Sequence, residues 1–396
     1  MSVVLKIRKE YHRFVRRQCA RHERAMNQDS LLTNVFKSKH TKFVLISYVT
    51  APFLKKIGVS HSNSLECQTA AEIFDKLGYC VDVIPLTASA RGVNLLKYSY
   101  VYGLGDILIE AFRYPEIRTI VYAPGCSSRY SRAATLRALR RFYDAHGKFI
   151  PESARLCLDF SEVLYFSDLI IPLGNNFVAD TYRVNGLSQN ICPLHGFYYD
   201  VYDIDLVKKD FLEAKGNFLW FGSRGSIHKG LDIVLDVFKK REDINLFICG
   251  ASSHESSFLE CYRKELNNEI GNITNMGFLD IEGDQFREVM NKCCAVLFPS
   301  ASEGGAIAIL NVMANGGLIP IVSRSTGLDV EQYGFVFDDL NNATVEKKID
   351  QLMVLEEKEV RMLAERIKED TRSGYSFTKY KQNLEKTITK EVQSNL

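Results

Sequence analysis

The 396-residue chain has no long hydrophobic run, because no apolar stretch approaches the roughly 20 residues that a membrane-spanning helix needs. Its N-terminus lacks the apolar core of a signal peptide. The ten cysteines are scattered with no Cys-x-x-Cys pair, which argues against the usual zinc spacing and against a disulfide framework. We therefore expect reduced, mostly buried thiols and a cytoplasmic protein.

Two common nucleotide-binding motifs are also missing. The sequence contains no Walker A spacing and no Gly-x-Gly-x-x-Gly. These absences argue against a nucleoside triphosphatase and against a dinucleotide-binding enzyme. No tandem short repeat and no low-complexity region is present either, so the chain is expected to fold into ordinary globular domains.

Length and charge suggest how the chain is organised. A chain of 396 residues is too long for one ordinary core, so two domains are expected. The composition is 46% hydrophobic and 25% charged, which is typical of globular proteins, and the formal net charge is only +2. That charge is uneven, because residues 1–28 contain eight Lys/Arg and two Glu.

The N-terminal segment, residues 1–40, has the pattern of a basic amphipathic helix in its first 25 residues. Its apolar residues recur at helical spacing, with arginines and lysines between them: Val4, Ile7, Tyr11, Phe14 and Val15. Such a helix could lie on an anionic membrane surface, or it could pack on its own domain with a solvated basic face. Nucleic acid is disfavoured as a partner, because no recognition motif accompanies the basic residues.

Strands and helices are predicted to alternate over residues 41–200. Such alternation favours a parallel sheet with helices on both faces. The predicted strands are Lys42–Tyr48, Cys80–Leu86, Thr119–Ala123, Asp168–Leu173 and Asn190–Leu194, and the predicted helices are Ser62–Leu77 and Ser131–His146.

The same alternation starts again after residue 216 and predicts a second domain over residues 217–375. Its predicted strands are Asn217–Phe221, Asn245–Cys249, Ile273–Phe278, Ala295–Phe298, Leu318–Val322 and Gly334–Phe337. Its predicted helical segments are Gly230–Lys240, Glu255–Leu266, Asp284–Lys292, Ala306–Ala314 and Thr344–Ile367. The pattern predicts an α/β protein with two doubly wound parallel-sheet domains. A last helical stripe, within residues 376–396, could pack back on the first domain.

The stretch Ser300–Ser323 is the most informative part of the chain. An apolar strand ends in a small polar loop that contains Glu303 and two glycines, and an apolar helix follows. Unpaired N–H groups and the helix dipole at such a helix start favour an anionic ligand. A carboxylate beside them suits the hydroxyls of a sugar, so the stretch predicts a sugar-phosphate site.

A second candidate loop, Phe221–Asp232, follows the first predicted strand of the second domain. Its glycines allow the backbone to approach a ligand, and Arg224 and Lys229 could supply two positive charges to a diphosphate. Ligands of open α/β sheets bind beyond the carboxyl ends of the strands, where this loop and Glu303 would both lie. The alternative is a solvated strand–helix loop with incidental charges.

The second half of the chain resembles the donor domain of retaining glycosyltransferases with the GT-B fold, in family 4 or a close relative (glycosyl transferases group 1). The resemblance covers roughly residues 217–340, and any one of its motifs alone would be weak. The matching pieces, in order, are Gly222 with Arg224 and Lys229-Gly230, Cys249-Gly250, Asn275–Leu279, Phe298–Gly304 and Gly316–Val322. It implies two Rossmann-like domains that face a central cleft.

The resemblance also implies a role for individual residues. Arg224 and Lys229 would neutralise the donor diphosphate, and Glu303 would hydrogen-bond the transferred sugar. The other donor-binding residues that it implies are Gly222, Ser223, Gly250, Gly277, Phe278, Ser302, Gly304, Gly305, Ala306 and Asn311. Members of the family typically need no metal ion, and the chain has no Asp-x-Asp-like metal motif in a suitable place.

Two departures from the family pattern concern donor binding. The family places a second Glu eight residues after the first to bind the ribose hydroxyls, and here Asn311 occupies that position. An amide can still hydrogen-bond a hydroxyl but carries no charge. Ser223 also separates Gly222 from Arg224, whereas the usual Arg directly follows the Gly.

The first domain is less informative about the acceptor. His61 lies in a loop that faces the cleft in this fold, although a lone loop histidine is more often merely exposed. The other candidates follow predicted strands or begin a helix, and for Asn175 a turn is the favoured interpretation. The acceptor-side or cleft candidates are His61, Asn63, Glu66, Gly125, Arg129 and Asn175.

Together these patterns predict a retaining, metal-independent glycosyltransferase without a cofactor, whose nucleotide-sugar (UDP- or GDP-linked) is a substrate. The expected acceptor is a glycan or a lipid-linked glycan in surface polysaccharide biosynthesis, such as lipopolysaccharide or capsule. The expected location is cytoplasmic, at the inner face of a bacterial membrane. Two alternatives stay open: a non-catalytic nucleotide-sugar or glycan-binding scaffold, and a GT-B epimerase or phosphorylase.

Overall fold

The computed structural model of the chain describes residues 31–54, 62–155, 163–251 and 254–394. These residues form two compact units. The predicted basic helix of residues 1–28 and the candidate His61 lie outside the described residues. Each unit contains one parallel sheet, and we name the units by the number of strands in their sheets.

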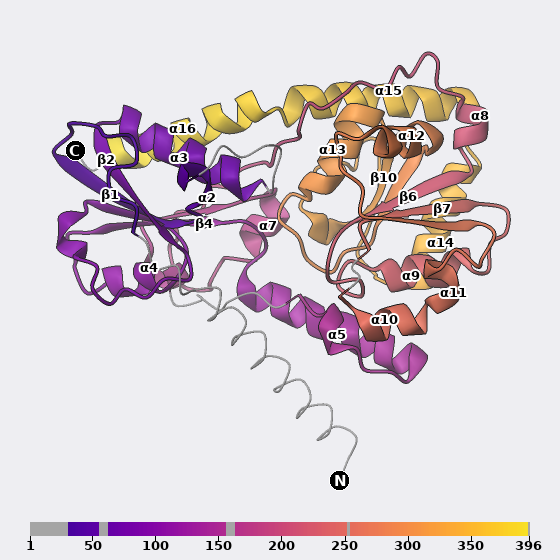
Figure 1. Cartoon of the computed structure of the whole chain (residues 1–396), viewed down its shortest axis with the longest axis horizontal. Coiled ribbons are helices and arrows are strands. Elements are labelled where there is room, and N and C mark those ends of the chain that lie inside the picture. Colours follow the sequence, from indigo (N-terminus) through magenta and orange to yellow (C-terminus); the bar gives the residue numbers. More distant parts are fainter. Residues whose placement is uncertain (1–30, 55–61, 156–162, 252–253, 395–396) are drawn as a thin grey trace, which may run out of the picture. The chain divides into compact units, whose positions relative to one another are not determined.

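The five-strand unit comprises the described parts of residues 31–129, 163–194 and 378–394. All its strand pairs are parallel, in the order β2-β1-β3-β4-β5. Figure 1 labels β1, β2 and β4 of this sheet. The strands are β1 (Lys42–Tyr48), β2 (Tyr79–Pro85), β3 (Tyr100–Gly103), β4 (Arg118–Ala123) and β5 (Leu169–Pro172). The helices include α2 (Ala51–Leu54), α3 (Asn63–Lys76), α4 (Asp106–Ala111), α6 (Val163–Phe166), α7 (Asn176–Asp180) and α16 (Phe377–Gln393).

The six-strand unit comprises the described parts of residues 130–155 and 195–377. Its strands are also parallel, in the order β11-β10-β9-β6-β7-β8. They are β6 (Asn217–Phe221), β7 (Asn245–Cys249), β8 (Ile273–Gly277), β9 (Ala295–Phe298), β10 (Ile319–Ser323) and β11 (Phe335–Phe337).

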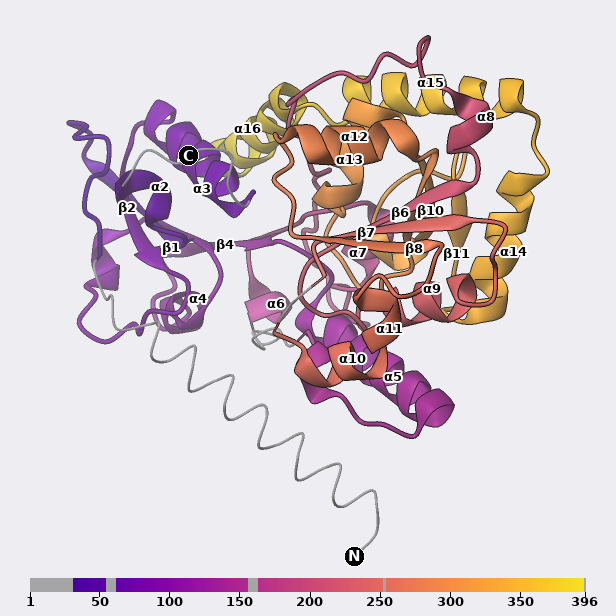
Figure 2. The ribbon, with the colours of Figure 1, turned by 45° about the vertical axis from the view of Figure 1, so that its right-hand side comes forward.

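Helices cover both faces of the six-strand sheet, as a doubly wound fold requires. Figures 1 and 2 show α12 (Asp284–Lys292), α13 (Ile307–Gly316) and α15 (Glu357–Gly374) on one face. On the other face lie α5 (Ser128–His146), α9 (Leu231–Phe238), α10 (Ser256–Cys261) and α11 (Arg263–Leu266). The remaining helices are α8 (Phe211–Ala214) and α14 (Asn342–Met353).

Continuous apolar runs explain why the central strands form. Val44, Leu45 and Ile46 in β1 are completely buried, and so are Phe218 to Trp220 in β6. A strand covered by helices on both faces buries successive side chains, so its sequence does not alternate between apolar and polar residues. Eight described cysteines are free thiols, and six of them are buried. Among the described helices, none is both long and apolar enough to span a bilayer.

Several predicted elements differ from the observed ones. The central strand β3 was not predicted, and Asn190–Leu194 forms only isolated bridges to β5 and to Leu173. The predicted helix Glu255–Leu266 is divided into α10 and α11, and Thr344–Ile367 is divided between α14 and α15. In addition, residues 130–155, which the sequence boundaries placed with the first domain, belong to the six-strand unit.

The C-terminal helix α16 packs within the five-strand unit for nearly all of its length. The buried hydroxyl of Tyr380 lies 3.0 Å from that of Tyr122 at the end of β4. Lys381 pairs with Glu72 of α3 at 2.7 Å, and Arg118 of β4 lies 3.5 Å from Glu391. The last helix of the chain is thereby attached to elements that begin about 300 residues earlier.

Candidate functional site

The predicted donor-binding residues gather at one edge of the six-strand sheet. The strand β6 lies between β9 and β7, and the chain runs from β6 outward through β7 to β8 before it returns to β9 (Figure 2). The loops that follow β6 and β9 therefore emerge side by side, at the point where the winding reverses. In open α/β sheets this switch point, beyond the carboxyl ends of the strands, is where ligands bind.

Glycines allow the loops at this edge to touch one another. A Cβ on Gly230, whose φ is +70°, would lie 2.3 Å from the Pro299 carbonyl oxygen. A Cβ on Gly250, whose φ is +88°, would lie 2.0 Å from the Gly222 carbonyl oxygen. The N–H of Gly222 donates to Cys249 at 3.1 Å. Backbone contact among the loops after β6, β7 and β9 requires glycine at these positions.

Lys229 brings a buried positive charge to this edge. Its side chain is largely inaccessible, since the residue is 8% exposed, and its Nζ donates to the Ser223 hydroxyl at 3.1 Å. Burial lowers the pKa of Lys229 from its ordinary value, while the nearby Glu303 carboxylate opposes that shift. A buried ammonium with few partners of its own is well placed to attract an anionic group.

Glu303 lies in the loop after β9, with its carboxylate among positive groups. Its Oε2 accepts a hydrogen bond from Arg155 Nη1 at 2.7 Å, and its Oε1 accepts one from the Ser300 hydroxyl at 3.1 Å. Burial alone would raise the pKa of this carboxyl, but Arg155, Lys229 and His228 outweigh burial and lower the pKa to about 2. Glu303 is therefore ionised at neutral pH.

His228 connects the loop after β6 to the loop after β9. Its Nε2 donates to the Ser302 carbonyl oxygen at 2.8 Å, so the proton must be on that nitrogen. Its Nδ1 lies 2.8 Å from the Thr135 hydroxyl of α5. Burial lowers the pKa of His228 to about 4, and the Arg155 charge adds to this effect. The imidazole is thus neutral and structural, and it fixes the backbone one residue before Glu303.

Glu255, which precedes α10, fixes the Gly-rich loop. The residue is 0% exposed, and its carboxylate accepts the N–H groups of Gly225 at 2.6 Å and of Ser226 at 3.0 Å. The Ser153 hydroxyl also donates to this carboxylate. Because a buried carboxylate is stable only with such partners, this cluster holds the backbone next to Arg224 in one conformation.

The helix α13 begins beside Glu303. Gly305 and Ala306 have positive φ values of 64° and 29°, and no side chain caps the first turn. Ala306 is strained in this region of φ/ψ space. The tight turn through Gly304 and Gly305 leaves the first amides of a ten-residue helix uncapped by side chains, which suits an anion or a hydroxyl.

Arg224, Gly277 and Phe278 were also predicted and lie at the same edge, where Arg224 and Phe278 are exposed. Arg224 is exposed and forms no ion pair with another described residue, so its guanidinium is available to a ligand. Phe278, just after β8, is 87% exposed, and Gly277 before it has a φ of +66°. A bare aromatic ring beyond a strand end is able to stack on a flat ligand group.

Asn311, which stands where the family has its second Glu, forms a hydrogen bond with the protein backbone. It lies in α13 and is buried, and its Oδ1 accepts the N–H of Tyr199 at 2.7 Å. Asn315, one turn later, donates to the Tyr199 carbonyl oxygen at 2.9 Å. The amide oxygen of Asn311 is therefore used to hold the segment that leads into the six-strand unit.

The candidates in the five-strand unit do not form one cluster of free polar groups. Glu66 is buried at the start of α3, where the Tyr48 hydroxyl donates to it at 2.8 Å, and burial raises its pKa. Asn175 caps α7 through hydrogen bonds from the N–H groups of Phe177 and Val178, which is the predicted turn role. The Gly125 carbonyl oxygen accepts from Tyr182, Arg129 is exposed, and Asn63 opens α3.

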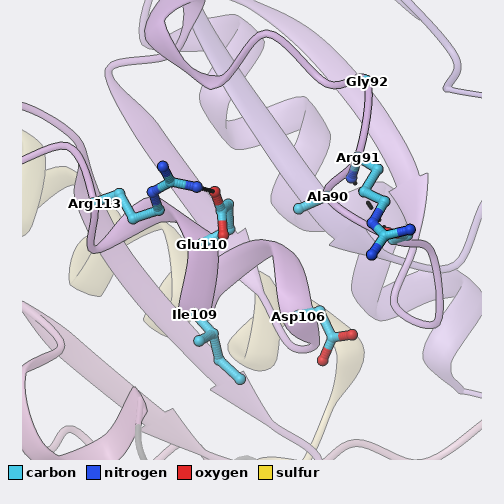
Figure 3. A pocket seen from close by; sticks show the side chains of 8 residues that line it. Ala90, Arg91, Gly92, Asp106, Ile109, Glu110 and Arg113 are labelled. Atoms are coloured by element: carbon cyan, nitrogen blue, oxygen red, sulfur yellow. Dashed lines mark hydrogen bonds and ion pairs between the residues drawn. The ribbon is translucent and has the colours of Figure 1, made fainter.

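A surface depression in the five-strand unit is separate from every predicted residue (Figure 3). Its charges are partly satisfied internally, because Arg113 pairs with Glu110 of α4. The lining residues are Ser89, Ala90, Arg91, Gly92, Asp106, Ile109, Glu110 and Arg113. We assign it no ligand. Among the described residues, no group of three or more His, Cys, Asp or Glu is placed to hold a metal ion.

The structure adds three residues that the sequence did not single out: Arg155, His228 and Glu255. His228 is adjacent to Lys229, so its position in the Gly-rich loop was the available signal. No sequence signal indicated Arg155 or Glu255, because each residue reaches the site from a segment remote from the motifs. Their role depends on tertiary contacts alone.

Comparison with known proteins concerns the fold and the second half of the chain. Residues 203–370 match the model of the family described as glycosyl transferases group 1. No curated protein matches the sequence significantly. Among solved structures, sucrose-phosphate synthase from Thermosynechococcus elongatus superposes with a TM-score of 0.61 at 13% identity, over 89% of this chain and 100% of that one.

Two further solved structures share the fold. Anabaena HepE in complex with UDP and glucose has a TM-score of 0.58 at 14% identity, over 88% of this chain and 100% of that one. The N-terminal domain of Candida albicans trehalose-6-phosphate phosphatase has a TM-score of 0.52 at 11% identity, over 91% and 98%. The protein thus has the two-sheet GT-B fold. Its residues 203–370 match the model of the group 1 glycosyl transferases, in agreement with the group 1 resemblance inferred from the motifs.

Proposed function

We propose that this protein is a retaining glycosyltransferase that moves a sugar from a nucleotide-sugar donor, UDP- or GDP-linked, to a glycan or lipid-linked acceptor. The observation that carries the proposal is that the buried ammonium of Lys229 and the ionised carboxylate of Glu303 lie close enough to influence each other's pKa, beside the uncapped start of α13. The match to the group 1 family over residues 203–370 supports it. Anabaena HepE, a protein of the same fold that forms a complex with UDP and glucose, supports the donor class.

In the proposed reaction, the donor diphosphate lies over the loops that follow β6 and β9. Lys229 and Arg224 neutralise the charge that accumulates on the diphosphate as its bond to the sugar breaks. The uncapped amides at the start of α13 add fixed dipoles of the right sign. Glu303 accepts a hydrogen bond from a sugar hydroxyl and so positions the ring. Most of the catalytic effect would come from this preorganised positive environment.

The acceptor hydroxyl then attacks the anomeric carbon from the face that the diphosphate leaves, so the configuration is retained. The new glycosidic bond forms as the sugar–phosphate bond breaks, and the hydroxyl proton passes to the departing diphosphate. Among the described residues, no side chain of the six-strand unit is assigned as a nucleophile or a base. Substrate positioning and charge neutralisation are the roles that this chain's residues have in the proposal.

Replacement of Lys229 tests the proposal directly. Because the ammonium would stabilise the leaving group, Lys229→Ala and the isosteric Lys229→Met should lower kcat on the order of 100-fold or more. The measurement is release of the nucleoside diphosphate with and without acceptor. Lys229→Met keeps most of the buried side-chain volume, so its melting temperature should stay close to that of the wild type, and a loss of its activity would not reflect unfolding.

Lys240→Ala is the matched control, because Lys240 is an exposed lysine at the end of α9. It should retain wild-type turnover. Equal turnover of Lys229→Met and the wild type would contradict the assignment. The donor base and sugar can be identified first by thermal shift with UDP-, GDP-, ADP- and CMP-sugars, since a true donor raises the melting temperature of the folded state.

One observation favours a second candidate, a non-catalytic scaffold that binds a nucleotide-sugar or glycan. Asn311 uses its amide oxygen on Tyr199 rather than leaving it for a ribose. A scaffold would bind donor but neither hydrolyse it nor transfer the sugar, whereas an enzyme should hydrolyse it slowly without acceptor. An epimerase on the same fold would release a new sugar in the absence of acceptor, so product analysis separates all three.

A further inference from the structure

The two side chains of the Arg155–Glu303 ion pair differ in their exposure to solvent. The Glu303 side chain is 10% exposed, whereas the Arg155 side chain is 46% exposed, although their charged atoms are 2.7 Å apart. Arg155 follows the short helical turn Pro151–Ser153, and both residues belong to the six-strand unit. A half-exposed arginine side chain thus holds a nearly buried carboxylate in place.

The backbone around Arg155 is anchored to the same elements that shape the donor loops. The Thr135 hydroxyl of α5, which contacts His228, lies 3.2 Å from the Arg155 carbonyl oxygen. The Ser153 hydroxyl donates to Glu255, the residue that fixes the Gly225 and Ser226 amides. A single buried carboxylate therefore positions both the loop of Arg224 and the segment that presents Arg155.

The charges at the site divide into two groups. Arg155 and Glu303 neutralise each other, so the pair offers a carboxylate acceptor without net charge. Lys229 and Arg224 remain, and their two positive charges match the two negative charges of a diphosphate diester. A carboxylate whose charge is balanced is suited to the hydroxyls of a neutral sugar.

We propose that Arg155 is a positioning residue for donor binding, which keeps Glu303 ionised and oriented toward the hydroxyls of an uncharged sugar. This inference rests on the proposed function. The carboxylate lone pairs that Arg155 and Ser300 leave unused accept from one sugar hydroxyl. Because Arg155 and Glu303 together carry no net charge, a sugar with uncharged hydroxyls fits this pair better than one with a charged substituent.

The proposal predicts a dependence on pH. The groups that face Glu303 are Arg155, Lys229, His228 and the Ser300 hydroxyl. Without Arg155, the first of the charges that oppose burial is lost, so the pKa of Glu303 should rise above about 2. The pKa of His228 should rise as well, because Arg155 lowers it, and the double variant with Glu303→Gln separates the two groups. Donor affinity of the variant should then decrease with falling pH, while that of the wild type should not.

The experiment measures binding by isothermal titration at pH 7.5, 6 and 5, with UDP-glucose, GDP-mannose and UDP alone as probes. The proteins are the wild type, Arg155→Ala, Arg155→Lys and Arg155→Ala with Glu303→Gln. Arg140→Ala is the control, since Arg140 lies on α5 but is exposed and pairs with Asp144. Loss of a charge-assisted contact should weaken sugar-nucleotide binding by Arg155→Ala about tenfold at pH 7.5, and further at pH 5.

Three further results are expected if Arg155 acts through Glu303. Arg155→Lys should restore the flat pH dependence, the double variant should lose the dependence, and UDP affinity should be unchanged throughout. Equal, pH-independent affinity of Arg155→Ala and the wild type would overturn the role of Arg155 alone. A parallel loss of UDP affinity would overturn it too. If the wild type binds none of the three probes, the proposed donor site fails, and this inference with it.

Discussion

At the scale of single residues, the site combines one ionised carboxylate with a neutral imidazole. Glu303 is held ionised by Arg155 and Lys229, whereas burial holds His228 neutral. The same positive charges act in opposite directions on the two groups, because they favour a carboxylate and disfavour an imidazolium. This contrast allows His228 to brace the loop through Ser302 without adding a titrating charge near neutral pH.

The low pKa of His228 predicts how stability depends on pH. The pKa is about 4 in the folded protein and 6.5 in the unfolded chain. The unfolded chain therefore binds the proton more readily, and stability should fall as pH decreases from 6.5 to 4. Between pH 7.5 and 5, the melting temperature of the wild type should decrease more than that of His228→Gln, by an amount that corresponds to about 2 kcal/mol.

The pH range chosen for that comparison isolates the histidine. Glu303 loses its stabilising charge only as pH falls from 4.5 to 2, below the range of the comparison. The other histidines are present in both proteins and cancel. If the melting temperatures of the wild type and His228→Gln fell equally between pH 7.5 and 5, His228 would be protonated in the folded state at pH 5. The hydrogen-bonding role of a neutral His228 would then be contradicted.

At the scale of elements, the loops of the donor edge depend on glycine at positions where backbones meet. Gly230→Ala would force a Cβ to within 2.3 Å of the Pro299 carbonyl oxygen at a φ of +70°. Strain and overlap together should destabilise the six-strand unit by about 3 kcal/mol or more. The measurement is the melting temperature and the yield of soluble protein.

Gly271→Ala is the matched control for that substitution. No atom lies within 4 Å of a Cβ at Gly271, and its φ is not positive, so this variant should melt close to the wild type. If Gly230→Ala and Gly271→Ala had the same melting temperature, the close approach of the loops after β6 and β9 would be contradicted.

The elements also show what local sequence could predict. The strands β1, β6, β7 and β9 were predicted with their observed bounds, because they are continuous apolar runs, and glycine or proline directly follows all of them except β1. The strand β3 was missed, since it has only four residues and its apolar character comes from tyrosines. Its place between β1 and β4 depends on partners distant in sequence, which local patterns do not specify.

The same limit applies to the site. The motifs after β6 and β9 predicted that Lys229 and Glu303 would lie at the same edge of the sheet, because the carboxyl ends of parallel strands share one edge. The strand order that makes their loops neighbours was not predicted. The motifs also did not predict that α5 would belong to the six-strand unit. Arg141 of α5 pairs with Asp232 of α9, and Thr135 contacts His228. Those long-range contacts also bring in Arg155, which no pattern near residue 155 reveals.

At the scale of the whole molecule, the uneven charge supports a further proposal, that residues 1–28 bind an anionic membrane surface and bring the enzyme to a lipid-linked acceptor. Each basic residue near such a surface contributes about 1 kcal/mol. Deletion of residues 1–28 should therefore release the protein from vesicles of anionic lipid at moderate salt. Donor binding should be unchanged, which serves as the control. Equal sedimentation of both forms with the vesicles would contradict the proposal.

The division of the chain also has a consequence for how the protein is made. The five-strand unit includes α16, and the Tyr122 hydroxyl of β4 meets Tyr380 inside it. During synthesis, β4 leaves the ribosome more than 250 residues before its hydroxyl partner. The six-strand unit, whose described residues end at Phe377, can therefore finish folding first. A chain that ends at residue 377 and has left the ribosome should already acquire protease resistance in that unit, while the other unit lacks its last helix.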